Sequence, residues 1–363
     1  MAPESSMGVA RESGWTLRAF RPDDEAAVLD LFERAFGRPA DAAVRRWKLG
    51  RLAAGSGDNV WLGVDRKDRP IFQYAGIPCT VDGPRGPKRC MVVVDVMCDP
   101  EFQGQGLLTK ISHRVYDIWR QAGVHALLGI PNERWGSRIE ALRWRPLQRL
   151  QWQTRVLRPA DVAARKLRLP WLARAAPLTD PWNVLWNKER RADRAFELDE
   201  SGALGPDLDE LICQWRHELP SRTVVLRNSE TLQRRYLDHP STDYRVWVAR
   251  RDGRAVAYLV FRSETTYLQH QAFIAELLVP PSQLDAARFL LRRLGHRLTA
   301  DGAAAVFALA MPGSSEQKLL RQAGFLVSGR SFQTRLVPLS EDAEHEAHNP
   351  SGWCLRGGDF DIV

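Results

Sequence analysis

Two glycines close together directly follow an apolar stretch of this sequence, and their type and spacing suggest chemistry. Residues 91–98 read MVVVDVMC, which is typical of a buried strand, and Asp99-Pro100 ends it. The turn Gln103-Gly104-Gln105-Gly106 leads into a helical pattern. The N–H groups of a first helical turn lack intrahelical partners, and the helix dipole favours negative charge there. Because glycine has no side chain, a phosphate could approach these N–H groups closely, so the arrangement predicts a phosphate site.

Two common phosphate-binding loops do not fit this turn. A P-loop requires a Lys-Ser/Thr pair after its last glycine, whereas Leu107-Leu108 stands there. The dinucleotide fingerprint requires three glycines and an acidic residue about twenty positions further on. Only two glycines are present, and the region around Gly123-Val124-His125 has no acidic residue at a strand end. We therefore expect a phosphorylated cofactor of another kind.

The segment resembles the acyl-CoA loop of the GNAT superfamily of N-acyltransferases. That loop has the pattern Gln/Arg-x-x-Gly-x-Gly/Ala after a strand that ends in a Pro-Glu type of turn. Here the pattern reads Gln103-Gly-Gln-Gly106-Leu-Leu108, after Asp99-Pro100-Glu101-Phe102. Leu108 is a departure, because most members have Gly or Ala at that position. The alternative is a left-handed glycine turn that only connects a strand to a helix.

The resemblance implies that acetyl-CoA, or another acyl-CoA, is the co-substrate and that backbone groups bind it. The pyrophosphate is expected to contact the amides or side chains of Gln103, Gly104, Gln105, Gly106, Leu107, Leu108 and Thr109. The pantetheine amides and the developing oxyanion are expected at the N–H groups of Val96, Met97 and Cys98. Asn132 is expected to contact the CoA arm, with capping of a helix over 133–143 as the alternative.

The general base is the residue that the sequence defines least. Asp95 lies within the apolar strand, where a carboxylate is costly unless it is partnered or functional. Partial burial would make it a better proton acceptor for an ammonium group. The competing interpretation is a structural ion pair. Many GNAT enzymes protonate the departing thiolate with a tyrosine, but the segment 133–144 contains none, which leaves the acid unassigned.

Composition indicates a soluble enzyme with two domains. The 363 residues include 52 basic and 44 acidic ones, for a net charge of +8. The basic residues are spread along the chain, so nucleic acid is not expected as a partner. The N-terminus lacks the apolar core of a signal peptide, and no apolar run approaches membrane-spanning length. Five cysteines without C-x-x-C spacing predict reduced thiols in a cytoplasmic protein and no metal site.

An internal repeat relates the two halves of the chain at an offset of 181 residues. Residues 93–100 read VVDVMCDP and residues 274–281 read IAELLVPP, which aligns Asp95 with Glu276. The same offset aligns Pro131-Asn132 with Pro312-Gly313 and Arg143-Trp144 with Gly324-Phe325. Because these similar segments occur in the same order in both halves, they indicate two copies of one α/β fold. The alternative is that any two α/β units have similar residues at their strand, turn and helix boundaries.

The copies are unequal, which predicts one active site per chain. Opposite the glycine turn, the second copy has Ser282-Gln-Leu-Asp-Ala-Ala-Arg288, which lacks glycine and is typical of an ordinary capped helix start. We therefore expect the second copy to shape the substrate pocket without binding the cofactor. The predicted organisation is a GNAT-like domain at 1–157, a linker at 158–205, a degenerate GNAT-like domain at 206–340 and a tail at 341–363.

Each copy is predicted to be an α/β (α+β) domain, a mixed, mostly antiparallel sheet flanked by helices. The pattern of the first copy predicts strands at 16–20, 60–65, 71–82, 91–98 and 124–130, and helices at 24–36, 41–49, 106–122 and 133–143. This order is similar to that of the GNAT core. The resemblance implies that the last strand diverges from the central one and leaves room for the pantetheine arm.

The segment 155–177 predicts a basic amphipathic helix with a break at Pro170. One interpretation is association with a membrane surface that carries a lipid-linked substrate. The other is a linker that buries Trp171, Trp182 and Trp186 between the domains. We favour the linker, because prolines interrupt any long interfacial helix.

The C-terminal tail ends in SGWCLRGGDFDIV and resembles the tails of tandem GNAT-like proteins encoded with bacterial polysaccharide genes. Its two carboxylates, Asp359 and Asp361, could line a pocket for a polar substrate or dock the tail by hydrogen bonds to backbone.

These features together predict a cytoplasmic GNAT-like N-acyltransferase that moves an acetyl or other acyl group from acyl-CoA to a primary amine. The tail makes an amino sugar of polysaccharide biosynthesis the first choice of acceptor. One alternative is a long-chain acyl or aminoacyl transferase on the same fold, which would need an apolar tunnel. Another is a non-catalytic sensor or scaffold that binds CoA without turnover, which the missing tyrosine keeps open. The oligomeric state is left open.

Overall fold

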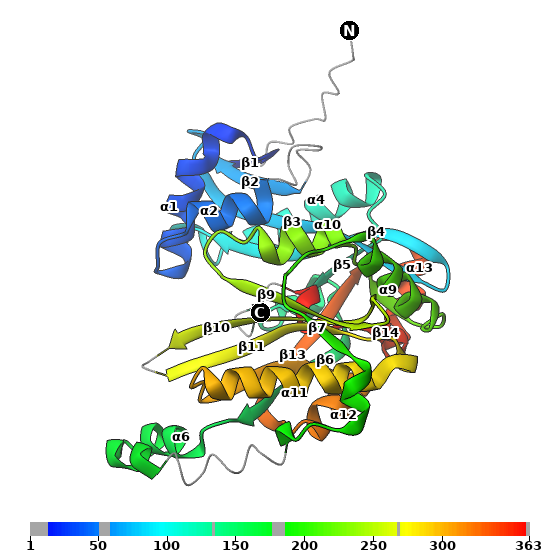
Figure 1. Cartoon of the computed structure of the whole chain (residues 1–363). Helices are drawn as coiled ribbons and strands as arrows, with labels where there is room; N and C mark the ends of the chain where they lie inside the picture. Colours follow the sequence, from blue (N-terminus) through cyan, green and yellow to red (C-terminus); the bar gives the residue numbers. More distant parts are fainter. Residues whose placement is uncertain (1–13, 51–58, 133–134, 176–185, 267–268, 361–363) are drawn as a thin grey trace. The chain divides into compact units, whose positions relative to one another are not determined.

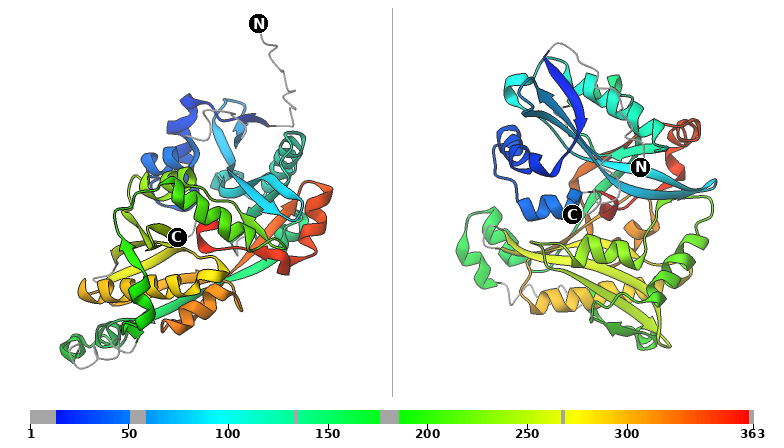
Figure 2. Two further views of the ribbon diagram at one scale, coloured as in Figure 1. Left: turned by 45° about the vertical axis from the view of Figure 1, so that its right-hand side comes forward. Right: turned by 90° about the horizontal axis from the view of Figure 1, so that it is seen from above.

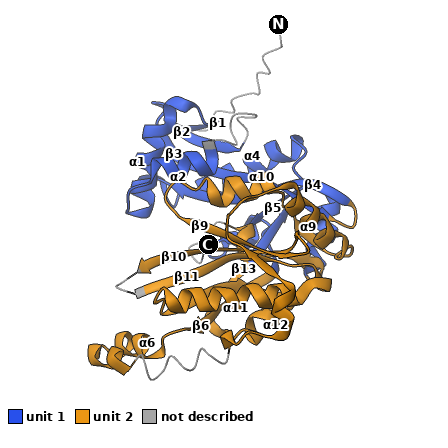
Figure 3. Ribbon diagram, in the orientation of Figure 1, with its two compact units in different colours: residues 1–82, 86–147, 334–350 blue, residues 83–85, 148–333, 351–363 orange. Residues whose placement is uncertain are grey.

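The computed structural model describes residues 14–50, 59–132, 135–175, 186–266 and 269–360 (Figure 1). Contacts within the chain divide it into two compact units (Figure 3). Unit 1 consists of residues 1–82, 86–147 and 334–350, and unit 2 of residues 83–85, 148–333 and 351–363. Each unit therefore combines segments that are far apart in the sequence. None of the helices in the described part of the chain is both long and apolar enough to cross a bilayer.

Unit 1 is a mixed, mostly antiparallel sheet with helices. Its elements are β1 (Trp15–Ala19), α1 (Glu25–Phe36), α2 (Ala42–Arg45), β2 (Val60–Asp65), β3 (Pro70–Gly83), β4 (Gly86–Cys98), α4 (Leu107–Gln121), β5 (Ala126–Gly129), α5 (Arg138–Ala141), the end of β13 (Leu326–Pro338) and α13 (Glu341–Ala347). The strand order is β1-β2-β3-β4-β5-β13. β4 and β5 are parallel, whereas β1–β2, β2–β3 and β5–β13 are antiparallel.

The core of unit 1 lies between the sheet and α4. Ile111, Val115 and Trp119 are fully buried and repeat every four residues, so they form one apolar stripe along the helix. The Trp119 indole packs beside Gly76 of β3, where a Cβ atom would lie 3.0 Å from the ring. Burial of each such side chain contributes roughly 1.5–3 kcal/mol. This packing fixes α4, and with it the position of the helix N-terminus beyond the end of β4.

Unit 2 has helices on both faces of its own strands, which run in mixed directions. Its elements are β6 (Arg145–Val156), α6 (Pro159–Lys166), β7 (Glu197–Asp199), α9 (Pro206–His217), β8 (Thr223–Val225), α10 (Ser229–Leu232), β9 (Tyr244–Arg251), β10 (Arg254–Thr266), β11 (Gln269–Leu278), α11 (Leu284–Ala300), β12 (Ala305–Ala310), α12 (Ser315–Gln322) and β14 (Trp353–Cys354). β11 and β12 are parallel, whereas the pairs β6–β12, β10–β11, β9–β10 and β7–β9 are antiparallel.

Strand alternation explains the two layers of unit 2. Trp247 and Ala249 of β9 belong to the apolar cluster of α11 and α12, whereas Val246 and Val248 belong to that of α9. Successive residues of a strand point to opposite faces, so one sheet covers two cores. α11 and α12 lie along one face of this sheet in both views of Figure 2.

Each sheet is completed by a strand from a distant part of the sequence. In unit 1, Gly129 of β5 pairs with Arg335 of β13, and in unit 2, Ala305 of β12 pairs with Val156 of β6. The contacts therefore assign residues 148–157 to unit 2 and residues 334–340 to unit 1, whereas the contiguous bounds expected from the sequence assign them the other way. Local sequence patterns predict strands but do not say which distant strand completes a sheet.

The predicted fold class is confirmed, with differences at two helices of unit 1. The helix expected at 41–49 ends as α-helix at Arg45 and continues as a π-helical turn over Arg46–Gly50. The helix expected at 133–143 is reduced to α5, and its N-cap residue is Ser137, so the prediction that Asn132 caps this helix is wrong. Residues 133 and 134 lie outside the described residues.

The predicted basic helix before Pro170 is present as α6, but the expected burial of Trp171 is wrong. The Trp171 side chain is 61% exposed, on a 3-10 turn over Pro170–Ala175. Trp182 lies outside the described residues. Trp186 is partly buried and packs on Gly324, where a Cβ atom would lie 2.9 Å from the indole. An apolar residue that follows a short basic helix, such as Trp171, thus need not be buried.

A buried charged cluster holds the C-terminal tail in unit 2. The Glu276 carboxylate accepts hydrogen bonds from Tyr258 at 2.7 Å and Tyr236 at 2.8 Å, and it pairs with Arg227 at 3.1 Å and Arg356 at 3.3 Å. All five side chains are buried. Burial alone would raise the pKa of Glu276, but the two guanidinium groups and the two phenols lower it to about 2.

The tail carboxylate Asp359 belongs to the same cluster. It pairs with Arg227 and accepts the backbone N–H of Arg356 at 2.7 Å, which favours docking of the tail over the pocket interpretation. At Gly358 a Cβ atom would lie 2.5 Å from the Tyr236 hydroxyl, so only glycine fits beside this cluster. Asp361 lies outside the described residues.

We expect the variant Glu276→Gln to lower the free energy of unfolding by about 3–5 kcal/mol, because it leaves the buried Arg356 guanidinium without its carboxylate partner and Arg227 with Asp359 alone. A folded pKa below the ordinary value of 4.5 also means that the carboxylate stabilises the fold above pH 4.5 and stops doing so as pH falls towards 2. The variant should therefore lose less stability than the parent chain between pH 5 and pH 3. Urea unfolding of both chains at these two pH values measures the difference.

The matched control is Glu230→Gln in the same unit, where the carboxylate is 74% exposed and 4.0 Å from Arg234. It should cost less than about 1 kcal/mol. Equal costs for the two variants would contradict a structural role for the buried cluster.

Candidate active site

The turn after β4 is held by a buried aspartate. The Asp99 side chain is 1% exposed, accepts the backbone N–H of Glu101 at 3.1 Å and pairs with Arg34 of α1 at 3.0 Å. The backbone N–H of Asp99 donates to Ile71 of β3 at 2.9 Å. Pro100–Phe102 then forms a short 3-10 turn. The turn is thus anchored to α1 and β3 before the glycines begin.

Both glycines of the turn have left-handed backbone conformations. φ is 79° at Gly104 and 76° at Gly106, a region that most residues enter only at a cost. Gly106 is the N-cap residue of α4 and supplies no side-chain cap. A Cβ atom at either glycine would meet no atom within 4 Å, so open space lies next to the first-turn N–H groups. The geometry is that of the anion site expected from the sequence.

β4 and β5 separate next to this turn. They pair only from Cys90 to Val92 on β4, although β4 continues to Cys98. Beyond this pairing, the Trp144 indole packs against Gly129, where a Cβ atom would lie only 3.0 Å from the ring. At the end of β4, the N–H and C=O groups on the β5 side are therefore not paired with β5. They can bind an extended ligand instead.

A cavity of about 280 Å³ lies where the strand end, the turn and α5 meet in unit 1. Nine of the predicted cofactor-binding residues line it: Val96, Met97, Cys98, Gln103, Gly104, Gly106, Leu107, Leu108 and Asn132. Gln105 and Thr109 are not in its lining, and the Gln105 side chain donates to the carbonyl of Glu101 at 3.2 Å. The structure thus brings most of the predicted residues together around one space, and their roles in cofactor binding stay predictions.

Sequence reasoning missed six other residues of the cavity wall. They are Ala35, Phe36, Phe72, Phe102, Trp135 and Arg138. Phe36 lies on α1 and Phe72 on β3, and no local motif links these elements to the turn. The apolar run of β3 predicts a buried strand but not which side chain faces a ligand. Trp135 and Arg138 follow Asn132 closely, so the Pro-Asn pair could have pointed to them.

Asp95 lies at a kink of β4 and forms an ion pair. Its φ is 47°, in the left-handed region, and the Gln73 side chain donates to its backbone oxygen at 3.0 Å. Its carboxylate is 2.9 Å from the ammonium group of Lys48. Asp95 is not part of the cavity wall. This arrangement favours the ion-pair interpretation, and the role of general base stays a prediction.

The cavity offers two findings on proton transfer. Burial, together with the neighbouring Asp99, raises the pKa of the Cys98 thiol to about 11, so at neutral pH it is not a thiolate nucleophile. Tyr74 and Tyr116 hydrogen-bond to each other at 3.0 Å in the core and do not line the cavity. The acid that protonates the departing thiolate therefore stays unassigned. His125 is buried between Ser340 and Glu346, as a packed imidazole.

The second copy has a different helix start at the corresponding position. α11 follows a 3-10 turn over Pro281–Gln283, and its N-cap residue Gln283 makes no side-chain cap, so the expected side-chain cap is wrong. The Ser282 N–H, in this 3-10 turn, donates at 2.8 Å to the carboxylate of Glu218, the C-cap residue of α9. The turn before α11 thus differs from the glycine turn before α4, and the expected loss of the cofactor site in the second copy stays a prediction.

Residues 16–137 match the profile described as an acetyltransferase (GNAT) domain, about a third of the chain. This stretch contains the strand, the glycine turn and every residue of the cavity wall except Arg138. The domain match over this stretch, together with the fold, supports an acyl-CoA-dependent N-acyltransferase.

Solved structures extend the likeness of the fold to nearly the whole chain. A GCN5-related N-acetyltransferase from Anabaena variabilis has a TM-score of 0.63 at 11% identity, covering 90% of this chain and 73% of that one. A probable N-acyltransferase from Enterococcus faecalis has a TM-score of 0.64 at 11% identity, covering 90% and 72%. N-myristoyltransferase from Saccharomyces cerevisiae, solved with myristoyl-CoA, has a TM-score of 0.59 at 12% identity, covering 93% and 83%. No curated protein sequence matches this chain.

We expect the variant Gly106→Glu to weaken CoA binding at least about a hundredfold, because a carboxylate would occupy and repel the anion position. Titration calorimetry of the intact chain with CoA measures this loss. The matched control is Gly123→Glu, since Gly123 has a φ of 75°, also has open space around its Cβ position and lies outside the cavity wall.

Both variants should lose about 1–2 kcal/mol of folding stability, since both force a side chain into the left-handed region. Only Gly106→Glu should lose affinity for CoA. If the control lost as much affinity, the effect would be structural and the turn would not be the binding site.

Proposed function

We propose that unit 1 transfers an acyl group from acyl-CoA to a primary amine. The observation that carries this proposal is the cavity that joins the end of β4 to uncapped N–H groups at the start of α4. Helix N-termini of this kind bind phosphates. The separated end of β4 adds backbone groups for the pantetheine arm, and the GNAT domain match covers the same residues.

The reaction needs few side chains. The amine nitrogen attacks the thioester carbonyl carbon, a C–N bond forms, and the C–S bond then breaks to release CoA as the thiol. N–H groups of Val96, Met97 or Cys98 would stabilise the oxyanion, and the amine loses a proton as the thiolate gains one. Direct attack by the amine leaves no step for Cys98, whose thiol lies in the cavity wall and keeps its proton at neutral pH.

The acceptor we propose is an amino sugar of polysaccharide biosynthesis, and the proposal rests on the resemblance of the C-terminal tail. The second copy would arise from duplication, since the order β9-β10-β11-α11-β12 repeats β2-β3-β4-α4-β5, with a parallel last pair in each. The lack of glycine in its turn, Ser282–Arg288, supports one cofactor site per chain. A cytoplasmic location belongs to the same proposal.

Two other functions stay as alternatives. A long-chain acyl transferase would need a tunnel beyond the cavity of about 280 Å³. A sensor or scaffold would bind CoA without turnover. Thiol release from acetyl-CoA, measured across amino sugars, amino acids and polyamines, separates these functions. Turnover with an amino sugar supports the proposal, whereas CoA binding without thiol release for any amine would contradict it.

We expect the variant Asp95→Asn to keep kcat within about tenfold, because the loss of a true general base lowers rates by about 10²–10⁴-fold. Asparagine tolerates the left-handed conformation, so the kink should persist. The partner variant Lys48→Met should lower the unfolding midpoint by about as much as Asp95→Asn does, because both variants break the same ion pair. A hundredfold loss of kcat in Asp95→Asn alone, with KM unchanged, would instead make Asp95 the base.

We also propose that α6 and the turn after it bind an anionic membrane surface. Leu167, Leu169 and Trp171 are 60%, 40% and 61% exposed. Four exposed basic residues accompany them: Arg165, Lys166, Arg168 and Arg174. An exposed tryptophan and leucines among basic residues are typical of interfacial anchors, and each basic side chain near an anionic surface adds about 1 kcal/mol.

Flotation with vesicles that contain phosphatidylserine tests this surface. The intact chain should float with these vesicles and much less with pure phosphatidylcholine vesicles. The double variant Leu167→Ser/Trp171→Ser should lose at least about tenfold in partitioning. The matched control Leu326→Ser/Val327→Ser removes two other exposed apolar side chains of unit 2, 74% and 49% exposed, and should bind as the parent. Equal flotation of all three chains would refute the anchor.

A further inference from the structure

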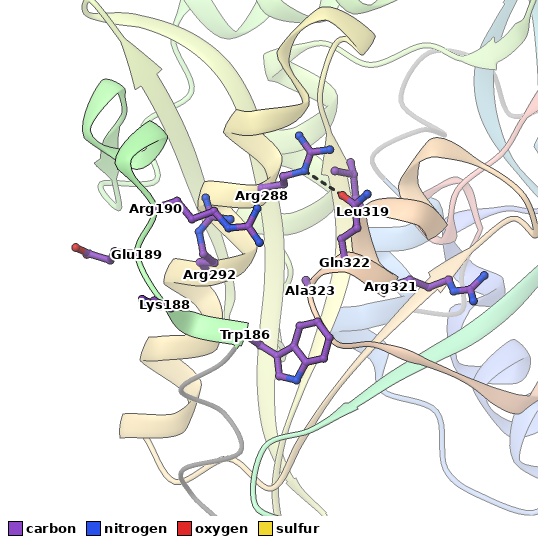
Figure 4. Close-up of a pocket in the computed structure, with 10 residues that line it drawn as sticks. All are labelled: Trp186, Lys188, Glu189, Arg190, Arg288, Arg292, Leu319, Arg321, Gln322 and Ala323. Atoms are coloured by element: carbon purple, nitrogen blue, oxygen red, sulfur yellow. Dashed lines mark hydrogen bonds between the residues drawn. The ribbon is translucent and has the colours of Figure 1, made fainter.

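Unit 2 has a large pocket of its own, between α11, α12 and the segment before Arg191. Its volume is about 840 Å³, within the range of small-molecule sites. The residues that line it are Trp186, Lys188, Glu189, Arg190, Arg288, Arg292, Leu319, Arg321, Gln322 and Ala323 (Figure 4). Five of the ten are basic and one is acidic. Neither the glycine turn nor the cavity of unit 1 is part of it.

The acidic partners of this pocket leave most of its charge uncompensated. Glu189 pairs with Arg293, which is outside the pocket wall, at 3.1 Å. Within the described residues, the side chains of Lys188, Arg190 and Arg321 have no hydrogen bond or ion pair, and all three are exposed. Unpaired cations around one hollow attract an anion more strongly than cations spread over a surface.

Two further guanidinium groups are held in place. Arg292 is buried, and Asp193 receives two of its N–H groups, one at 2.9 Å. Arg288 donates to Gln322 at 3.0 Å and to Asp285 at 2.7 Å. Fixed arginines lose less side-chain entropy on binding, and their planar donors match phosphate oxygens.

The pocket has a basic end and an apolar end. In Figure 4 the guanidinium groups of Arg190, Arg288 and Arg292 gather at one end, whereas the Trp186 indole lies at the other, below Ala323. Trp186 is fixed by its packing on Gly324. An indole at one end and guanidinium groups at the other would suit a ligand that combines a planar ring with adjacent phosphates.

We propose that this pocket binds an organic diphosphate that carries a planar ring, in the manner of a nucleoside diphosphate. Arg190, Arg288 and Arg292 bind the phosphates, and Trp186 contacts the ring. This site is separate from the acyl-CoA site of unit 1, so it does not depend on the proposed acyl transfer. It would give the second copy a ligand of its own, either a nucleotide-linked substrate or a regulatory nucleotide.

Calorimetry with uridine diphosphate, inorganic pyrophosphate and uridine tests the proposal on the full chain. The Gly106→Glu variant is the background, because it removes diphosphate binding at the turn of unit 1. We expect uridine diphosphate to bind in this background at least tenfold more tightly than pyrophosphate, and uridine more weakly than either. Absence of uridine diphosphate binding would overturn the proposal. Equal affinity for pyrophosphate and uridine diphosphate would overturn the role of Trp186.

Charge-reversal variants locate the site. Arg190→Glu/Arg288→Glu should weaken uridine diphosphate at least tenfold, whereas Arg234→Glu/Arg245→Glu should change affinity less than twofold. The control reverses two other surface arginines of unit 2, outside the pocket. Equal losses in both pairs would reduce the effect to net charge and contradict the site. If the first pair does not fold, Arg190→Gln/Arg288→Gln should still weaken binding at least threefold.

Trp186→Ala should weaken uridine diphosphate but not pyrophosphate, and an equal loss of both would contradict contact with the ring. Thiol release from acetyl-CoA by the parent chain, measured in parallel, separates this proposal from acyl transfer, because either activity can fail while the other persists.

Discussion

Uncapped N–H groups at the start of α4 are the constraint on which the proposed acyl-CoA site depends. They are exposed to a ligand only because Gly106, in the left-handed region, begins the helix without a side chain. Contacts elsewhere in unit 1 hold the turn in its left-handed conformation. Asp99 ties it to α1 and β3, and the buried stripe that ends in Trp119 fixes the helix that carries these N–H groups.

The two copies differ at the turn before the helix that follows the central strand. In the first copy this turn has two glycines in the left-handed region and faces a cavity. In the second copy it is a 3-10 turn without glycine, and the N–H of Ser282 in it donates to the Glu218 carboxylate. The carboxylates of the central strands differ as well, because Asp95 pairs with Lys48 whereas Glu276 is buried among arginines and tyrosines.

The sequence predicts the parts of the structure that depend on local patterns. The expected strand at 60–65 is β2, and the expected helix at 24–36 is α1, because periodicity and turn residues act over a few positions. The glycine turn is where the Gln-x-x-Gly pattern places it. Phe36 and Phe72 could not be predicted, since their place in the cavity wall depends on how α1 and β3 pack in the fold. Likewise, no local pattern shows that β13 completes the sheet of unit 1, or that Lys48 reaches Asp95.

The central claim is that N–H groups between Gln103 and Thr109 hold the diphosphate of CoA. A crystal structure of the chain with bound CoA tests it most directly. The account predicts phosphate oxygens within about 3 Å of these backbone nitrogens, and the pantetheine arm along the end of β4. A turn whose N–H groups bond to other parts of the chain, with CoA bound elsewhere or not at all, would contradict it.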